Sequence, residues 1–277
     1  MFSIINFASS SGPIIHITPL VLFTVHGVAI TNSMLYGWIC AVFIMTLLIW
    51  VTQKVTLNPK KGIIQFVEAG VDFIASTVEK SFEDKARGRK YVPYFVTLFF
   101  FILLNNWLGL IPGVGEPLVV HGHPLFRPFT GDLNATLAAG VVTMIYVYSS
   151  SVREVGFKRY MGHFFIGSPL NPMYLGLGLI EMLTDLTRVI SLSIRLFLNV
   201  TIGEIIIAVF SYLGSFLAPL TALPFTMIEM FVGALQAYIF VILSTMYLAI
   251  AVNHSTTHVD LTEEAVPETM DLKPERA

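Results

Sequence analysis

The chain alternates long apolar runs with short charged or polar segments, and five of the runs are long enough to be membrane-spanning helices. A helix needs about 20 mostly apolar residues to cross a hydrocarbon core of roughly 30 Å. The expected spans are residues 34–53, 92–112 and 133–151, followed by two longer regions at 174–212 and 216–252. The pattern therefore predicts an all-α polytopic membrane protein with a single membrane domain over residues 1–277.

The segment between the first two spans has a different pattern. Across residues 62–84, apolar side chains such as Ile63 and Phe73 alternate with the charged side chains of Glu68 and Asp72. This pattern is typical of an amphipathic helix that lies in the membrane interface and does not cross it. We therefore expect one interfacial helix in addition to the five spans.

The composition supports a membrane protein and excludes some partners. Hydrophobic residues make up 55% of the chain and charged residues 12%, with a mean hydropathy of +0.75. A water-exposed domain surface needs more charge than this, whereas the net charge of -2 is too small to suggest nucleic acid as a partner. Cys40 is the single cysteine, so no intrachain disulfide and no cysteine-based metal site are expected. The N-terminal segment has no basic stretch before an apolar core, so a signal peptide is not expected.

Lysine and arginine are distributed unevenly between the segments that connect the spans. Two segments hold eleven of the sixteen basic residues. They are residues 54–90 and 153–159. Short basic loops stay cytoplasmic, so both are expected inside, whereas residues 1–33 have no basic residue and the 113–132 loop has Arg127 alone, so both are expected outside. Five spans then place the acidic tail, residues 253–277, inside, where its composition predicts a mobile segment.

The last two apolar regions hold nearly all of the charged and amide residues that fall within predicted spans. They are Glu181, Asp185, Arg188, Arg195, Asn199, Glu204, Glu229 and Gln236. A charge at the centre of a spanning helix costs about 2.5 to 3.5 kcal/mol on insertion scales, so such residues normally face protein or water and serve a pathway. Asp185 can neutralise Arg188 three residues later on the same helix face. Arg195 has no acidic residue at that spacing, so its counter-charge must come from elsewhere, most simply from a carboxylate on another subunit.

If these two regions form an antiparallel hairpin, residue numbers predict which side chains share a depth. Arg195 with Gln236, and Glu204 with Glu229, are both centred on the turn near residues 214–219. The glutamates would then lie together about 13 Å nearer the outer end than Arg195. Glu204 is nine residues from Arg195, which places it on the opposite side of the helix. We therefore expect the glutamates to form a separate polar site reached from outside, with no arginine at their own depth.

These motifs resemble those of subunit a of the F-type ATP synthases. "SLSIRLFLNVTIGE" carries that family's pattern of Arg195, Asn199, Gly203 and Glu204, and "ALQAYIFVILSTMYL" resembles the partner helix, with its glutamine at position 236. "NNWLGLIPG" and "NPKKGIIQFVE" fit the family's earlier helices, so the resemblance extends over residues 13–255.

The resemblance implies a stator subunit that forms two offset proton half-channels, separated by Arg195, against a rotating c-ring of proteolipid subunits. The ring would supply the carboxylate opposite Arg195. The resemblance further implies a peripheral-stalk subunit b, the rest of the complex and membrane lipid as partners, in a bacterial plasma membrane or a mitochondrial inner membrane. No cofactor is expected. The chain contains no phosphate-binding loop or nucleophile motif, so it is predicted to conduct ions and not to be an enzyme.

Two sets of acidic residues are assigned to the half-channels. Family members often have one glutamate and one histidine at positions 204 and 229, whereas this chain has two glutamates, which are expected to share a proton. Asn199 is expected to be their hydrogen-bonding neighbour in the outer half-channel. Glu181, Asp185 and Ser191 are candidates for the inner half-channel, because the two acids share the broad face of the helix on which Arg195 lies.

Other functions remain alternatives at this point. An independent secondary ion transporter with a midplane site would show internal repeats and broken helices, but the long 174–212 region contains no proline. A structural scaffold would leave Arg195 without a purpose. Paired histidines at "HGHP" and "HSTTH" suggest a metal site, but neither pair has a nearby cysteine or a clear carboxylate partner, so loop composition is the preferred explanation.

Overall fold

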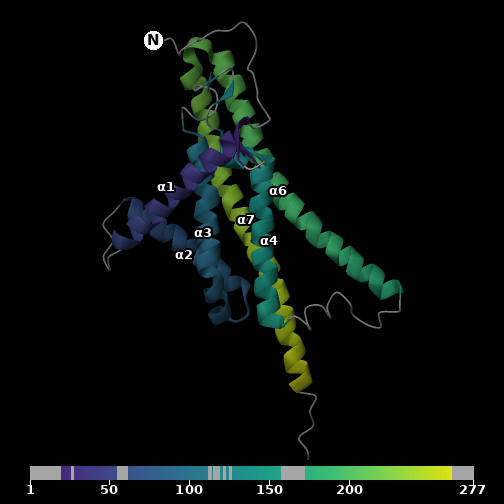
Figure 1. Ribbon diagram of the computed structural model, residues 1–277. Coiled ribbons are helices and arrows are strands. Elements are labelled where there is room, and N and C mark those ends of the chain that lie inside the picture. The colour runs from purple at the N-terminus through teal and green to yellow at the C-terminus, as the bar shows by residue number, and fades with distance from the viewer. Residues whose placement is uncertain are drawn as a thin grey trace, which may run out of the picture.

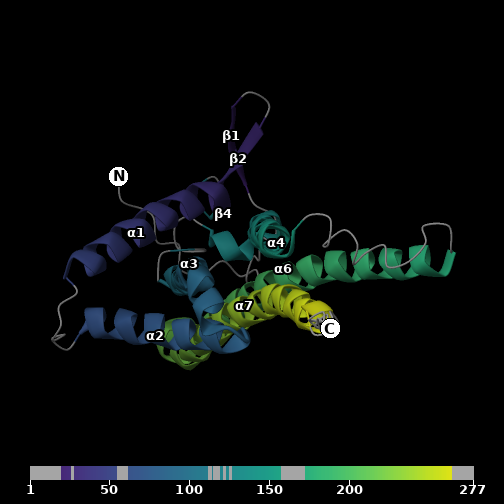
Figure 2. The same ribbon diagram turned by 90° about the horizontal axis from the view of Figure 1, so that it is seen from below.

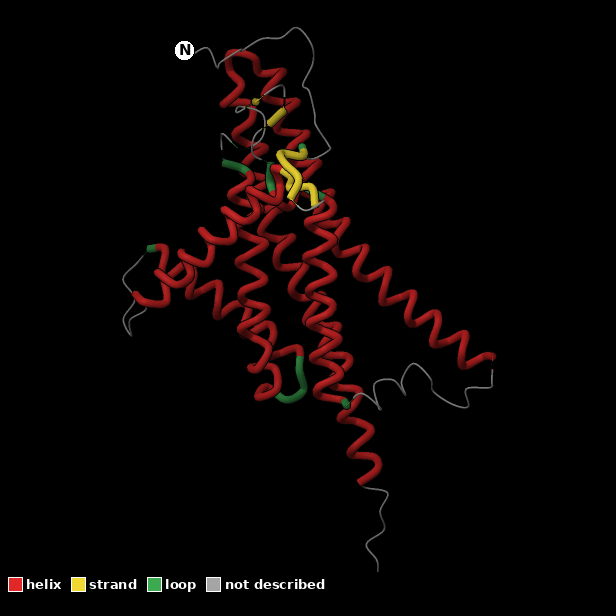
Figure 3. The backbone as a smooth tube through the Cα atoms, in the orientation of Figure 1, coloured by secondary structure: helices red, strands yellow, loops and turns green. Residues whose placement is uncertain are grey.

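The structure is a computed structural model, and it describes residues 20–25, 28–54, 62–111, 114, 119–120, 123–124, 127–156 and 172–263. These residues are mostly helical (Figure 3). The helices are α1 (Asn32–Lys54), α2 (Ile63–Ser81), α3 (Lys85–Gly109), α4 (Leu133–Val155), α6 (Pro172–Gly214) and α7 (Ala218–Glu263). The short 3-10 helices are η1 (Phe129–Gly131), which precedes α4, and η2 (Ser215–Leu217), which lies in the turn of the α6–α7 hairpin.

Two small antiparallel β-hairpins lie outside the helices. One joins β1 (Val21–Val25) to β2 (Val28–Thr31) immediately before α1, and the other joins β3 (Val119–Val120) to β4 (His123–Pro124). Neither hairpin is predicted by the hydropathy pattern.

Helices α3, α4, α6 and α7 pack together into a bundle, and α1 and α2 extend away from it on one side (Figure 1). The N-terminal arm of α6 diverges from the bundle on the other side, as both ribbon views show (Figure 2). The buried core includes the large side chains of Phe95 and Phe100 on α3, Leu192 on α6 and Phe240 on α7. Many apolar side chains outside this core are exposed, which a helical protein surrounded by lipid requires.

Four continuous helical stretches are long and apolar enough to cross a membrane. They are Asn32–Lys54, Lys85–Gly109, Leu133–Val155 and Leu186–Asn253. The last stretch contains both arms of the α6–α7 hairpin, so the four stretches are compatible with the five crossings that the sequence predicts. Helix α2 is not among them, in agreement with an interfacial position. The predicted fold class is therefore confirmed.

Some helix boundaries differ from the prediction. Helix α3 begins at Lys85, within the charged segment, because the Asp84 side chain accepts a hydrogen bond from the Ala86 amide and caps the helix. Helix α7 extends to Glu263, past the expected end at residue 252. The expected tail therefore begins as helix, and residues 264–277 lie outside the described part of the chain.

The segment that precedes α4 is anchored to α1. Asp132 is buried, caps α4 by accepting from the Asn134 amide, and accepts a 2.5 Å hydrogen bond from the Ser33 hydroxyl at the start of α1. The Phe129 ring lies against Gly37 of α1, where a larger residue would clash with it. These contacts fix the segment 127–132 beside α6, near the end of the bundle at which the α6–α7 hairpin turns.

Candidate functional site: an exposed arginine and a glutamate pair on the α6–α7 hairpin

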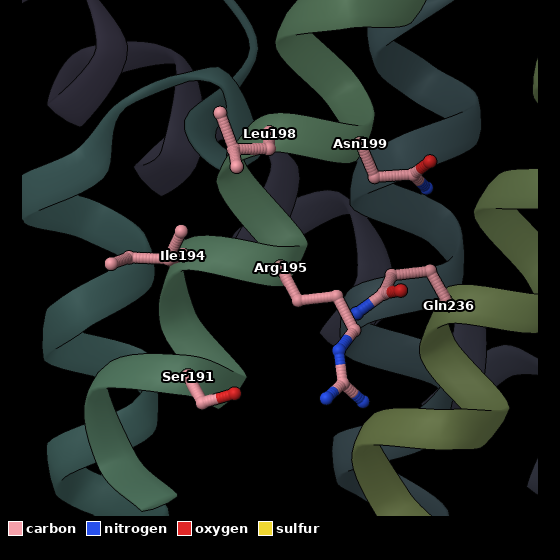
Figure 4. A pocket seen from close by; sticks show the side chains of 6 residues that line it. All are labelled: Ser191, Ile194, Arg195, Leu198, Asn199 and Gln236. Atoms are coloured by element: carbon pink, nitrogen blue, oxygen red, sulfur yellow. The ribbon is translucent and has the colours of Figure 1, made fainter. Parts of the chain in front are cut away.

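Arg195 lies in an open groove of about 580 Å³ on the surface of the α6–α7 hairpin (Figure 4). Its lining residues are Ser191, Ile194, Arg195, Leu198 and Asn199 from α6 and Gln236 from α7. The Arg195 side chain is exposed. Among the residues that the structure describes, none forms an ion pair or a hydrogen bond with it.

The helical period of α6 determines which way Arg195 faces. Leu192 and Leu196 turn into the bundle and are 2% and 1% exposed, so Ser191 and Arg195 fall on the outward face. Ser193, also buried, occupies the space that a side chain at Gly140 of α4 would fill, which lets α4 and α6 approach closely. Packing on one face of α6 thus leaves the arginine on the other.

Two amide side chains in the groove have unused hydrogen-bonding capacity. Nε2 of Gln236 and Nδ2 of Asn199 are buried and have no hydrogen-bond partner among the described residues. Buried polar atoms are normally hydrogen-bonded, so these donors are available to water or to a group on another subunit. Asn106 of α3 is a third amide with unused capacity, although it does not line the Arg195 groove. It donates to the Gly233 carbonyl at 3.1 Å, while its Oδ1 has no partner among the described residues, and sequence reasoning did not select it as a site residue.

Glu204 and Glu229 lie nearer the turn of the hairpin, outside the Arg195 groove. The Glu229 carboxylate packs directly on Gly203, in the space where any side chain at that position would stand. The absence of a side chain at Gly203 therefore brings Glu229 of α7 next to Glu204 of α6. The structure thus places Gln236 beside Arg195 and Glu229 beside Glu204, which is the register expected from the sequence.

Arg127 reaches the same polar site from the segment before η1. It is 5% exposed, and its Nη2 donates to the Gly131 carbonyl at 2.8 Å. A Cβ atom built on Gly131 would lie 3.8 Å from Arg127 Nε and 3.5 Å from Glu204 Oε1, so both side chains border this glycine. They are close enough for a Coulombic interaction.

The expectation that no arginine shares the depth of the glutamates is therefore wrong. It considered the two hairpin helices alone, whereas Arg127 comes from the segment that joins α3 to α4. The available signal was that Arg127 is the one basic residue of its loop.

Some charged residues that the sequence singles out are not placed by the structure in the Arg195 groove or at the glutamate pair. Glu181 and Asp185 belong to α6, but their side chains lie outside the described part of the structure, so their role stays a prediction. The Arg188 guanidinium lies over the Tyr247 ring of α7, 4.9 Å from its centroid. This cation–π contact supplies a stabilising interaction that the sequence interpretation, based on Asp185, did not include.

The described residues contain no group of histidine, cysteine and acidic side chains that could hold a metal ion. The histidines of "HGHP" and "HSTTH" have side chains outside the described part of the chain.

Comparison with known proteins gives a consistent result over most of the chain. The family profile described as "ATP synthase A chain" matches residues 34–249. The chain is 32% identical over 245 residues to ATP synthase subunit a 2 of Chlorobaculum tepidum, an alignment that covers 83% of this chain and 65% of that protein. It is 32% identical over 220 residues to ATP synthase subunit a of Sulfurihydrogenibium sp., with 76% of this chain and 95% of that protein covered. For ATP synthase subunit a of Moorella thermoacetica the identity is 28% over 234 residues, covering 84% of this chain and 96% of that protein.

The profile match includes α2, α3, α4 and all of the residues of the Arg195 and glutamate sites on α6 and α7. The chain belongs to the ATP synthase A chain family of polytopic membrane proteins.

Proposed function

We propose that this chain is the stator subunit of the membrane sector of an F-type ATP synthase, and that it couples proton flow to ATP synthesis. In this proposal it forms two offset proton half-channels against a rotating c-ring of proteolipid subunits, and Arg195 separates them. The observation that carries the proposal is an exposed arginine, on an apolar helix face, that has no acidic partner among the described residues. Such a charge requires a counter-charge from outside the chain.

Arg195 acts electrostatically. As the ring turns, the guanidinium stabilises the ionised carboxylate of the passing ring subunit, which requires that carboxylate to have released its proton first. A fixed positive charge also repels protons, so none passes directly from one half-channel to the other. Gln236 and Asn199 line the same groove and offer buried donors to the same carboxylate or to water.

The outer half-channel is assigned to Glu204, Glu229 and Asn199. The two glutamates form a polar site displaced from Arg195 toward the turn of the hairpin, and this displacement is the offset that a two-channel path needs. Glu181, Asp185 and Ser191 are assigned to the inner half-channel. Ser191 supports this assignment because it lies in the Arg195 groove on the side away from the glutamates.

The chain acts as a non-catalytic conductor of protons within a larger complex. Its partners are the c-ring, a peripheral-stalk subunit b, the other subunits of the synthase and membrane lipid. We place its N-terminus outside and its C-terminus inside a bacterial plasma membrane, because the basic loops at 54–90 and 153–159 are retained on the cytoplasmic side.

The test replaces Arg195 in the assembled ATP synthase. In membrane vesicles, Arg195→Ala should abolish ATP synthesis driven by a proton gradient, whereas Arg153→Ala, which removes an exposed arginine at the end of α4, should retain it. Arg195→Lys should also fail, because a compact ammonium does not reproduce the planar guanidinium fork. Coupled synthesis near the wild-type rate in Arg195→Ala membranes would refute the proposal.

A further inference from the structure

Among the residues that the structure describes, two charged groups approach Glu204. Glu229 approaches Glu204 from α7, and Arg127 approaches it from the segment before η1. Asp132, next to Gly131, is directed elsewhere: it binds the Ser33 hydroxyl of α1 and the Asn134 amide at the start of α4. Its charge is stabilised there by the N-terminal end of the α4 dipole.

Arg127 is positioned for an interaction with the glutamates. Its side chain is 5% exposed, and its Nη2 is bound to the Gly131 carbonyl. Glu204 borders the same glycine. A buried guanidinium is strongly destabilising unless an opposite charge lies nearby. The segment that carries it is fixed by Asp132 and Phe129 against α1, so the charge is held at one place beside α6.

We propose that Arg127 is the fixed counter-charge of the Glu204–Glu229 pair and a positioning residue of the outer half-channel. This inference rests on the proposed function of the two glutamates as proton carriers. When the pair holds one proton, the guanidinium and the remaining carboxylate cancel, and the three groups have no net charge. A second proton that enters from outside makes the group positive, so that one proton is released toward the ring and the neutral state returns.

The test compares four variants of the assembled complex. They are Arg127→Gln, Arg127→Lys, Glu204→Gln/Glu229→Gln and the triple variant that combines Arg127→Gln with both glutamine changes. Arg153→Gln is the matched control, because this arginine is exposed and remote from the pair. Two quantities are measured: passive proton conduction by vesicles from which the catalytic head has been removed, and the thermal midpoint of the solubilised complex.

We expect Arg127→Gln to slow conduction about tenfold, the factor that corresponds to a loss of about 1.4 kcal/mol of charge stabilisation along the path, and Arg127→Lys, which keeps the charge, to retain most of the conduction. The stability effect should reverse sign between backgrounds. Arg127→Gln should lower the thermal midpoint of the wild-type complex but raise that of the Glu204→Gln/Glu229→Gln complex by roughly 2–4 °C, because there the guanidinium no longer faces the two carboxylates.

Wild-type conduction in Arg127→Gln would overturn the inference. So would an equal loss of stability in both backgrounds, since an arginine that merely anchors the Gly131 carbonyl would have the same effect in each. If Arg127→Gln does not assemble, assembly of the triple variant becomes the test. Assembly of the triple variant supports the role of Arg127 as a counter-charge. If the triple variant fails to assemble while the Glu204→Gln/Glu229→Gln complex does assemble, that role is refuted. Wild-type conduction in Glu204→Gln/Glu229→Gln would instead refute the proposed outer half-channel itself.

Discussion

Arg195 of α6 and Gln236 of α7 line one groove, with the Gln236 side chain beside the arginine and its Nε2 buried without a partner among the described residues (Figure 4). A buried donor that the fold leaves unsatisfied destabilises the resting protein. The amide lies next to the exposed Arg195, so under the proposed function it donates to a ring carboxylate or to a water molecule that enters the groove.

Replacing Gln236 by leucine separates this role from packing. Gln236→Leu keeps a similar volume and removes an unsatisfied polar group, so the thermal midpoint of the complex should be unchanged or higher. Proton-driven ATP synthesis should fall roughly tenfold, the value of about one hydrogen bond to a charged group. Met246→Ala, at an exposed position of the same helix, is the control. Equal losses of stability and synthesis in Gln236→Leu would show that the amide serves packing alone.

Gly203 provides a test of the glutamate pair that changes no ionisable group. A Cβ atom at this position would overlap the Glu229 carboxylate, so Gly203→Ala should displace that carboxylate and slow passive proton conduction several-fold. Glu229→Asp in the same chain shortens the acid by one methylene and should restore part of the loss.

The matched control for this prediction is Gly176→Ala. Gly176 lies in the same helix and has no heavy atom near the site of a new Cβ, so the change should be neutral or slightly stabilising by helix propensity. If Gly203→Ala conducts as well as Gly176→Ala, the close packing of Glu229 against α6 is not needed for the path.

The number of carboxylates matters as well as their packing. Glu204→Gln and Glu229→Gln each leave one acid to accept a proton, so each should slow passive conduction moderately. The double change removes both acids and should slow conduction by a further factor of about ten or more. Purely additive effects of the two single changes in this assay would show that the glutamates do not act as one unit.

The spans and the hairpin register could be predicted from the sequence because each depends on a single quantity that can be counted along the chain. Apolar runs are matched to the thickness of the bilayer, and residues on an antiparallel hairpin are level when their numbers have a constant sum. Residue numbers alone therefore predict that Arg195 shares a depth with Gln236, and that Glu204 shares a depth with Glu229.

The position of Arg127 could not be predicted in this way. It depends on how the segment before α4 folds back, and that is determined by contacts between residues far apart in the chain, such as Ser33 with Asp132 and Gly37 with Phe129. Hydropathy and helical period contain no information about such contacts. The start of α3 at Lys85 could have been predicted from the sequence, because Asp84, directly before it, is a typical helix-capping residue.

The proposed inner half-channel rests mainly on the sequence, and solvent access can test it. Helix α6 places Ser191 on the outward face and Leu192 in the bundle, so these neighbours form a matched pair. In a Cys40→Ser background, the variants Glu181→Cys, Asp185→Cys and Ser191→Cys should react with a membrane-impermeant thiol reagent from the cytoplasmic face and not from the other. Leu192→Cys should not react, because its side chain packs against α4 and α7 in the core and no water reaches it. Ser191 lies one helical turn, about 6 Å, from Arg195, so labelling there means that an aqueous path descends to the arginine. If labelling occurs at position 181 and stops before 185, the acids of this arm lie at the membrane interface, and the inner half-channel must be formed by another helix.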